Sequence, residues 1–363
     1  MSTSTETLLN KLPNSQPHYP FITRLILELY LAGELPNLAS LDIEPQYGYV
    51  ARLVHNNGRV RFIRGKTLNI NFTTSSEIAR DKGYTKYFLQ QLNYPTPEAK
   101  TFILPDYLVE IDRNLSRYGF MDYAEIAQIP TYINQQIGYP CFIKPNAGSQ
   151  GKGVSKCFND QDTQEVLELY QQQGFRVLIV EKAINFPDYR VVVLNEKVVS
   201  CYLRKPLVVL GDGLKTIREL LLDRQESFVK RGREVLIQLD DPRIFKQAAL
   251  FGYTLDTILP EGSSFQVYAA SNLSLGGESE DYTSRIHSHW KDLAIRLAHD
   301  MGLLFCGVDL ACADIEDPTA EYSILEINSA PGMDNYAASG EEQSQIVRAI
   351  YREIFNEVIF LSK

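Results

Sequence analysis

Three oxygen-bearing side chains stand out in two apolar segments of the last third of the chain. Asp309 is the one acid in CGVDL, and YSILEIN carries Glu326 and Asn328 two residues apart. Side chains at i and i+2 of a strand share a face, so Glu326 and Asn328 point the same way, while Leu325 and Ile327 are expected in the core. Two carboxylates and an amide oxygen suit Mg²⁺, and without a cation the acids would repel each other. Two unrelated edge acids are the alternative interpretation.

A second segment, CFIKPNAGSQGKGV, places Lys144 at the end of an apolar run and before a cluster of glycines. The glycine spacing matches neither the Walker A loop nor the dinucleotide-binding fingerprint. A glycine-rich hairpin can still fold over an anion and donate backbone N–H groups to it, with Lys144 supplying a point charge from below. The alternative is a glycine-rich hairpin with an incidental lysine.

A third segment, VLIVEKAINFPDYRVVVL, could bind a nucleoside. Its apolar strand ends in Glu181 and Lys182, and Ile184 and Asp188 follow. An adenine ring needs an apolar slot and backbone hydrogen bonds, which Glu181 to Ile184 could provide, and Asp188 could accept from ribose hydroxyls. A surface ion pair followed by a turn is the alternative.

The elements that must position these residues are mixed strands and helices. Segments such as CFIK, VLIVEK, YRVVVL and VVSCYLR are β-branched and aromatic, whereas FITRLILELYL and HWKDLAIRLAHDMG have apolar residues at helical spacing. Asn57-Gly58 predicts a hairpin, and Thr216 with Glu219 predicts a capping box. Several strands follow one another directly, which favours an α+β fold over a doubly wound parallel sheet.

Composition limits the classes of function. The chain has 363 residues, 44% hydrophobic and 22% charged, with a net charge of −9. This acidic balance disfavours nucleic-acid and membrane partners, and no apolar segment is long enough to span a bilayer. Five cysteines without a Cys-x-x-Cys pair predict buried free thiols and a cytoplasmic location. His287 and His289 could be a zinc pair, although a polar helix start explains them as well.

Together these segments resemble the ATP-grasp superfamily. The resemblance rests on Lys82 in RDKGYTK, on the Lys144 and EKAINFPDYR segments, on CGVDL and on LEINSAPGM, in this order, and it covers most of the chain from about Asp81 onward. DYRVVVLNEKVVSCYLRKPLVVLGDGLKTIRELL and NLSLGGES resemble the ATP-grasp part of cyanophycin synthetase and bifunctional glutathione synthetase, with Leu275 where that segment usually has Thr. D-alanine–D-alanine ligase is a more distant likeness.

The resemblance implies a role for each matching position. Lys82 and Lys144 would contact the ATP phosphates, and the 147–153 loop would close over them. The residues implied to contact ATP are Lys82, Lys144, Ser149, Gln150, Gly151, Gly153, Glu181, Lys182, Ile184 and Asp188. Two Mg²⁺ ions, which Mn²⁺ could replace, would be bound by Asp309, Glu326 and Asn328. Arg190 and Arg204 would face the triphosphate or acyl phosphate, and Asn272, Gly276 and Gly277 would line the acceptor side.

The implied fold is two α+β subdomains that grip ATP, behind a smaller N-terminal domain. Expected boundaries are 1–78 for the N-terminal region with a flexible tail, 79–185 for the central subdomain with its lid loop, and 186–363 for the C-terminal subdomain. The implied activity is an ATP-dependent carboxylate–amine ligase that forms an amide from amino acids or small peptides, and dimers are common in the family. The alternatives are an ATP-grasp kinase acting on a hydroxyl and a non-catalytic ATP-binding protein.

Overall fold

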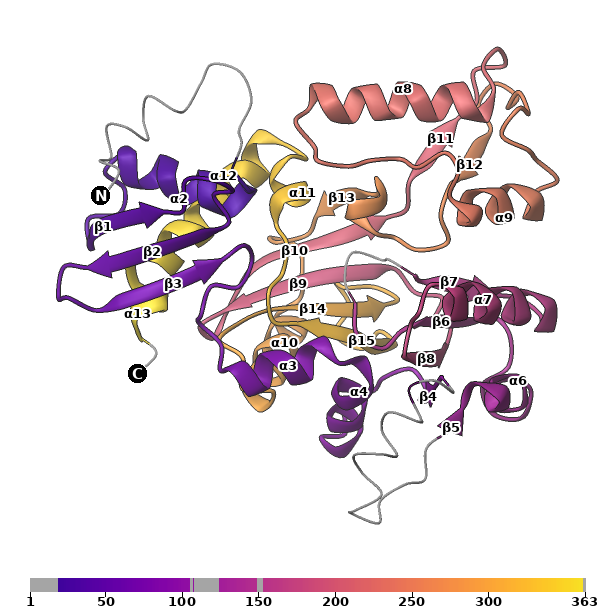
Figure 1. The fold of residues 1–363 in the computed structure, drawn as a ribbon, viewed down its shortest axis with the longest axis horizontal. Helices are drawn as coiled ribbons and strands as arrows, with labels where there is room; N and C mark the ends of the chain where they lie inside the picture. Colours follow the sequence, from indigo (N-terminus) through magenta and orange to yellow (C-terminus); the bar gives the residue numbers. More distant parts are fainter. Residues whose placement is uncertain (1–18, 105–106, 108–123, 149–152, 362–363) are drawn as a thin grey trace.

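The computed structural model describes residues 19–104, 107, 124–148 and 153–361, and within them the chain forms four β-sheets (Figure 1). Helices and strands are mixed, and most neighbouring strands are antiparallel, which confirms the α+β prediction. Residues 1–18, 105–106, 108–123, 149–152 and 362–363 lie outside the described residues, and with them most of the expected flexible tail and of the expected lid loop. In the described part of the chain, no helix has the length and apolar character needed to cross a membrane.

A three-stranded antiparallel sheet forms the N-terminal unit. Its elements are α2 (Phe21–Leu31), β1 (Leu38–Ile43), β2 (Val50–His55) and β3 (Val60–Arg64). The predicted hairpin is confirmed, because β2 and β3 pair across Asn57-Gly58, where Gly58 has φ +84°. A left-handed conformation is accessible to glycine without a steric cost, so this turn type demands it.

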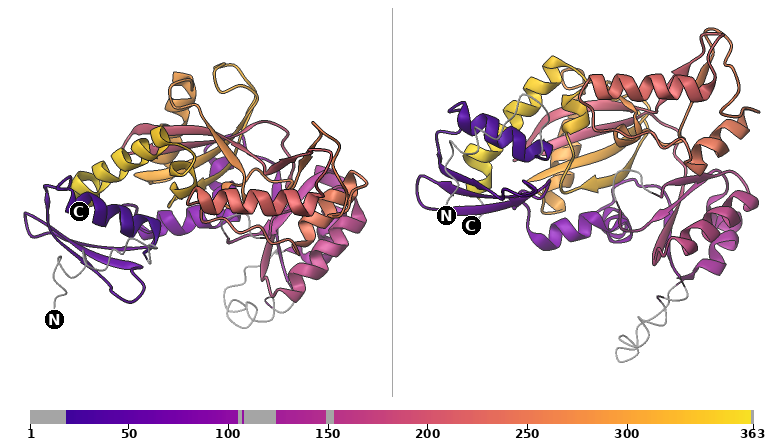
Figure 2. Two further views of the ribbon diagram at one scale, coloured as in Figure 1. Left: turned by 90° about the horizontal axis from the view of Figure 1, so that it is seen from above. Right: turned by 45° about the horizontal axis from the view of Figure 1, so that its top comes forward.

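The N-terminal sheet shares its hydrophobic core with the last helices of the chain. These are α11 (Asp334–Ala337), α12 (Glu341–Glu353), η5 (Ile354–Val358) and α13 (Ile359–Leu361). Leu29 of α2 and Phe355 of η5 are both fully buried in this core. In both figures the indigo and yellow ribbons lie together at one end of the molecule (Figures 1 and 2). The two ends of the described chain therefore stabilise each other.

The central sheet has the order β5-β4-β8-β6-β7. Its strands and flanking helices are α3 (Thr73–Arg80), α4 (Lys82–Gln91), β4 (Ala99–Ile103), β5 (Ala124–Glu125), η2 (Ile126–Gln128), α6 (Ile129–Tyr132), η3 (Ile133–Ile137), β6 (Cys141–Pro145), β7 (Ser155–Cys157), α7 (Asp160–Gln172) and β8 (Val177–Lys182). The predicted glycine-rich hairpin is confirmed, since β6 and β7 are antiparallel partners. Alternate residues of β6 face the core, so Lys144 lies on the opposite face from Ile143.

The C-terminal sheet has the order β13-β10-β9-β14-β15. Its elements are β9 (Asp188–Leu194), β10 (Lys197–Lys205), β13 (Glu278–Asp281), α10 (Ser288–Asp300), β14 (Phe305–Cys312) and β15 (Tyr322–Asn328). Both faces of β9 are buried: Val191 and Val193 pack toward α10, whereas Val192 and Leu194 join the core of the N-terminal unit. A sheet covered on both sides is a rigid support for polar groups at its ends.

A separate unit is inserted between β10 and β13. It consists of β11 (Val208–Leu210), α8 (Ile217–Lys230), α9 (Pro242–Leu250), β12 (Ser264–Gln266) and η4 (Leu273–Leu275), and it has its own core. The predicted capping box is present, because Thr216 Oγ1 accepts from Glu219 N and the Glu219 carboxylate accepts from Thr216 N. This reciprocal pair satisfies two backbone donors and sets the start of α8.

The five cysteines are free and buried, as predicted. His287 and His289 are explained by the start of α10: His287 is its N-cap, and its ring accepts from the backbone N–H of His289. The zinc alternative finds no support, because the described residues contain no group of three His, Cys, Asp or Glu side chains placed to hold a metal.

Trp290 is expected to contribute strongly to the stability of the C-terminal sheet. It is 1% exposed, and its ring Nε1–H donates to the carbonyl of Asp317 at 3.1 Å. Trp290→Ala should lower the free energy of unfolding by about 3–5 kcal/mol, because it opens a cavity and removes this bond. Thermal and urea denaturation would measure the change. Asp292→Ala, at an exposed site of the same helix, should change it by less than about 0.5 kcal/mol.

Candidate active site

A row of charged side chains crosses three neighbouring strands of the C-terminal sheet. Arg190 of β9 lies opposite Asp309 of β14, and Asp309 lies opposite Glu326 of β15. Directly opposed residues of antiparallel strands have their side chains on the same face and about 5 Å apart. The strand pairing thus brings Asp309 and Glu326 together, as the sequence predicted, and adds a cation at one end of the row.

Two arginines neutralise Asp309. The Arg190 guanidinium binds both of its carboxylate oxygens, and Arg204 of β10 lies 2.9 Å from Oδ2. Arg204 also donates to Asp188 at 2.7 Å. Asp309 is 2% exposed and Arg190 is 9% exposed, so this is a buried ionic network. Burial raises the pKa of the Asp309 carboxyl to about 6, and the two guanidinium groups act in the opposite direction.

Glu326 is held in its ionised form. The Asn328 amide donates to Glu326 Oε1 at 3.0 Å, which confirms that the two side chains share a face. Burial would raise the pKa of Glu326, but Lys82 and Lys144 hold it well below its usual range. Two ionised acids and an amide oxygen on rigid strands are hard ligands for a divalent cation.

The prediction that Leu325 lies in the core is wrong. The ladder between β14 and β15 shifts by one residue: Asp309 pairs with Glu326, but Leu310 pairs with Ile324. This bulge sends Ile324 and Ile327 into the core, whereas Leu325 is only half-buried. A bulge inserts an extra residue and re-aims side chains, and simple alternation cannot anticipate it.

Across from this row, the central subdomain holds a buried cluster of two lysines and one acid. Lys144 of β6 donates to Glu181 Oε1, and Lys86 of α4 lies 3.4 Å from Glu181 Oε2. All three residues are less than 10% exposed. The pKa of Glu181 is lowered by these two lysines, against the effect of burial. Lys86 has no counterpart among the predicted site residues.

Lys82 connects helix α4 to the glycine-rich hairpin. Its ammonium donates to the carbonyl of Gly148 at 3.2 Å. Asp81 caps the helix by accepting from Tyr84 N, and its other oxygen accepts from the Asn146 amide at 2.7 Å. Helix α4 packs against β15, and the positive charges of Lys82 and Lys144 lower the pKa of Glu326, so the cations of the central subdomain face the acids of the C-terminal sheet.

Two buried polar atoms of this site have no hydrogen-bond partner among the residues that the structure describes. Glu181 Oε2 accepts no hydrogen bond, and Arg204 Nε donates none, within the described part of the chain. Buried polar atoms without a partner in the protein are usually satisfied by a ligand, an ion or a water. A nucleotide would satisfy both, because it offers ring amino groups as donors and phosphate oxygens as acceptors.

The remaining residues that were predicted to bind the nucleotide differ in how far the structure supports that role. The Lys182 backbone N–H donates to Glu98 O, so strand pairing already uses this amide, and Ile184 is half-buried just after β8. Gly153 has φ +70°, and an added Cβ would lie 2.9 Å from Pro145, so a side chain there would be strained and crowded. Ser149, Gln150 and Gly151 lie outside the described residues.

The predicted acceptor residues lie beside the end of β10, next to Arg204. Gly277 packs so closely that an added Cβ would be 2.4 Å from Lys205 O, and Gly276 adopts φ +93°. The Asn272 side chain is used locally, since its Oδ1 accepts from Ser274 N and caps η4. This segment therefore borders the charged row with its closely packed backbone and not with the Asn272 side chain.

Three further charged or polar residues near the site were not predicted from the sequence. Lys86, Asn146 and Lys66 reach the site from separate elements, and Lys66 Nζ lies 3.1 Å from Asp334 Oδ1 beside the loop that follows β15. Lys86 carried one signal, because RDKGYTK places a second lysine one helical turn after Lys82, on the buried side of α4. Lys66 carried none, since its partner is distant in the chain.

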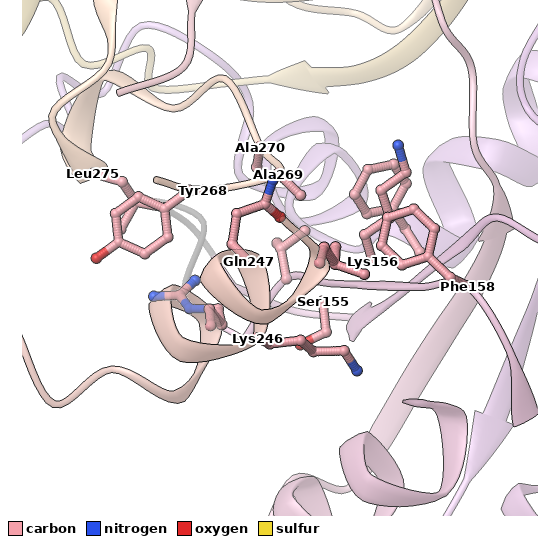
Figure 3. Close-up of a pocket in the computed structure, with 13 residues that line it drawn as sticks. Ser155, Lys156, Phe158, Lys246, Gln247, Tyr268, Ala269, Ala270 and Leu275 are labelled. Carbon is pink, nitrogen blue, oxygen red and sulfur yellow. The ribbon is translucent and has the colours of Figure 1, made fainter. Parts of the chain in front are cut away.

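A pocket lies between the β6–β7 hairpin and α9 (Figure 3). None of the predicted site residues line it. It is lined by Phe142, Val154, Ser155, Lys156, Phe158, Arg243, Lys246, Gln247, Leu250, Tyr268, Ala269, Ala270 and Leu275. Lys246 pairs with Asp162 at 2.7 Å, and Arg243 pairs with Asp241. Its lining combines aromatic and aliphatic side chains with polar and cationic ones.

Comparisons with known proteins identify the fold. Residues 110–198 match the ATP-grasp domain model, and residues 265–350 match the RimK-like ATP-grasp domain model. A crystal structure of a bifunctional glutathione synthetase from Pasteurella multocida superimposes with a TM-score of 0.54 at 20% sequence identity. It covers 92% of this chain and 44% of that one.

Two groups of curated relatives are similar in sequence. Cyanophycin synthetase of Crocosphaera subtropica is 30% identical over 295 residues, which is 79% of this chain and 31% of that protein. The glutathione biosynthesis bifunctional protein GshAB of Streptococcus thermophilus is 30% identical over 290 residues, 77% of this chain and 36% of that protein. The chain thus spans about a third of the length of these relatives.

Proposed function

We propose that this chain, which has the ATP-grasp fold, is an ATP-dependent carboxylate–amine ligase that forms an amide through an acyl phosphate. The proposal rests on one observation: two clusters of opposite charge face each other. Acids and an amide on β14 and β15 lie opposite lysines of the central subdomain, close enough for those lysines to lower the pKa of Glu326. A site that brings cations to one side and metal-type ligands to the other suits Mg-ATP.

For ATP, the proposed contacts follow the geometry. Lys82 and Lys144 would bind phosphate oxygens, and Glu181 would accept from the adenine amino group through its orphaned Oε2. Asp188 now binds Arg204 at 2.7 Å and would accept from the ribose hydroxyls. Ile184 would contribute an apolar wall and its backbone.

For Mg²⁺, the proposed ligands are Asp309, Glu326 and Asn328. Their chemistry fits, since Mg²⁺ is usually held by one or two carboxylates together with substrate phosphates. Bound there, it would neutralise phosphate charge during phosphoryl transfer. Asp309 would keep Arg190 and Arg204 close to the same phosphates, because both guanidinium groups are already paired with it.

The chemistry needs alignment and charge cancellation more than covalent help. A carboxylate oxygen of the acid attacks the γ-phosphorus of ATP, and ADP leaves, which gives an acyl phosphate. The amine then attacks the acyl carbon, phosphate leaves, and the nitrogen loses a proton. Arg190 and Arg204 would stabilise the charge that builds on the transferred phosphoryl group and on the tetrahedral oxyanion.

The substrates are proposed as amino acids or small peptides. Relatives named for cyanophycin and glutathione synthesis support this class. The segment with Asn272, Gly276 and Gly277 would form the wall of the acceptor side, since it packs against the end of β10 beside Arg204.

The test is ADP release with Mg-ATP across amino acids and dipeptides, supplied singly and in pairs, with Glu326→Gln as the inactive comparison. ADP that requires both a carboxylate and an amine, with an amide found by mass spectrometry, would support the ligase. ADP formed with a single hydroxyl compound would support a kinase instead. ATP binding without turnover on any pair would favour a non-catalytic ATP-binding protein.

A further inference from the structure

We propose that Lys86 is a positioning residue: it keeps the buried Glu181 carboxylate charge-paired and so frees Lys144 to bind ATP phosphates. This inference rests on the proposed ATP site and adds a residue with no assigned role. Lys86 would not touch the nucleotide. It would act through Glu181, by lowering the cost of breaking the pair between Glu181 and Lys144.

Two lysines share one carboxylate in this cluster. Lys144 donates to Oε1 of Glu181, and Lys86 Nζ lies 3.4 Å from Oε2. The side chains of Lys86, Lys144 and Glu181 are 6%, 11% and 5% exposed, so solvent screens their charges weakly. Glu181 pairs with both lysines, so one of them can turn to an anion while the other keeps this acid paired.

The two lysines differ in how firmly they are held. Lys86 also donates to Thr96 Oγ1 at 2.9 Å, and that hydroxyl donates to the Ile324 carbonyl at 2.9 Å. The chain of bonds anchors Lys86 between α4 and β15. Lys144 lies four residues before Gly148, at the start of the glycine-rich hairpin, and Glu181 is the partner that the described residues offer its ammonium. Lys86 is fixed, whereas Lys144 is placed to exchange partners.

The energetic consequence follows from burial. If Lys144 were the sole counter-ion of Glu181, its transfer to a phosphate would leave a buried carboxylate unpaired, which is strongly unfavourable. With Lys86 present, the acid remains in an ion pair after the transfer. ATP affinity should therefore depend on Lys86 even though the residue makes no contact with ATP.

The number of protons taken up when Mg-ATP binds provides an independent test of the role of Lys86. The pKa of Lys86 is lowered to about 8, chiefly by burial and also by repulsion from Lys144, while Glu181 and Glu326 act in the opposite direction. When phosphates neutralise Lys144, that repulsion falls and the pKa of Lys86 rises. A ligand that raises a pKa takes up protons just above the free-state value. Mg-ATP binding at about pH 8.5 should therefore be accompanied by proton uptake.

The first experiment compares Mg-ATP dissociation constants by calorimetry for the wild type, Lys86→Met, Lys86→Arg and Lys100→Met. Lys86→Met should weaken binding by about tenfold or more, whereas Lys86→Arg should stay within about threefold of the wild type. Lys100→Met is the matched control, because Lys100 is exposed on β4, and it should bind like the wild type.

The second experiment measures proton uptake by the wild type and the variants from the heat of binding in two buffers of different ionisation enthalpy. Uptake by the wild type that disappears in Lys86→Met is the expected result. Equal affinity of Lys86→Met and the wild type, or wild-type binding without uptake at about pH 8.5, would overturn the role of Lys86. Failure of the wild type to bind Mg-ATP would instead contradict the proposed function.

Discussion

Glu326→Gln should reduce Mg-dependent ADP release by about a hundredfold or more while leaving the fold intact. Glutamine keeps the shape of the side chain and can still accept from the Asn328 amide, which lies 3.0 Å from Oε1. It removes the negative charge that faces Lys82 and Lys144 and that would bind Mg²⁺. The rate of ADP release at saturating ATP measures the effect.

Two further observations make this prediction specific. Raising the Mg²⁺ or Mn²⁺ concentration should recover part of the lost rate, because a weakened metal site fills again at higher metal concentration. Glu321→Gln, at an exposed position just before the same strand, should keep full activity. A Glu326→Gln protein with wild-type rate and metal dependence would remove Glu326 from the metal site.

Asp309→Asn should abolish activity and also destabilise the protein by about 3 kcal/mol. The carboxylate is 2% exposed and is shared by Arg190 and Arg204. Asparagine cannot neutralise them, so the two buried guanidinium groups would lose the carboxylate that they share, and Arg204 would keep its ion pair with Asp188. Thermal denaturation and ADP release measure the two effects separately.

A double mutant separates stability from catalysis at this position. Adding Arg190→Met to Asp309→Asn removes one unpaired buried cation, so it should restore much of the lost stability. It should not restore ADP release, because it removes the charge that would face the phosphates. If Asp309→Asn alone kept wild-type stability, the ionic network would be weaker than its burial implies.

Much of the fold could be predicted because the relevant rules are local. The hairpin at Asn57-Gly58, the capping box of Thr216 and the glycine-rich β6–β7 hairpin each depend on a few adjacent residues, and all are confirmed. Turns and helix caps depend on two to five adjacent residues, so the sequence of those residues is enough to predict them.

The candidate site was predicted less completely than the fold. Glu326 and Asn328 share a face as the strand period requires, and Asp309 lies opposite Glu326. Strand alternation failed at Leu325, where a bulge shifts the ladder by one residue. A bulge depends on how two strands pair and on what each face must bury, and neither can be inferred from one strand alone.

The sequence by itself determined the kinds of chemistry available: acids and an amide on a strand, lysines beside a glycine-rich hairpin, and the local elements that carry them. The tertiary structure alone decided which charges meet. Arg190, Asp309 and Glu326 form one row because three strands pair in a single register, and Lys86 reaches Glu181 because α4 packs on the central subdomain. The pairs Arg190–Asp309 and Lys86–Glu181 join residues more than ninety positions apart, where only the packing of whole elements sets the distance.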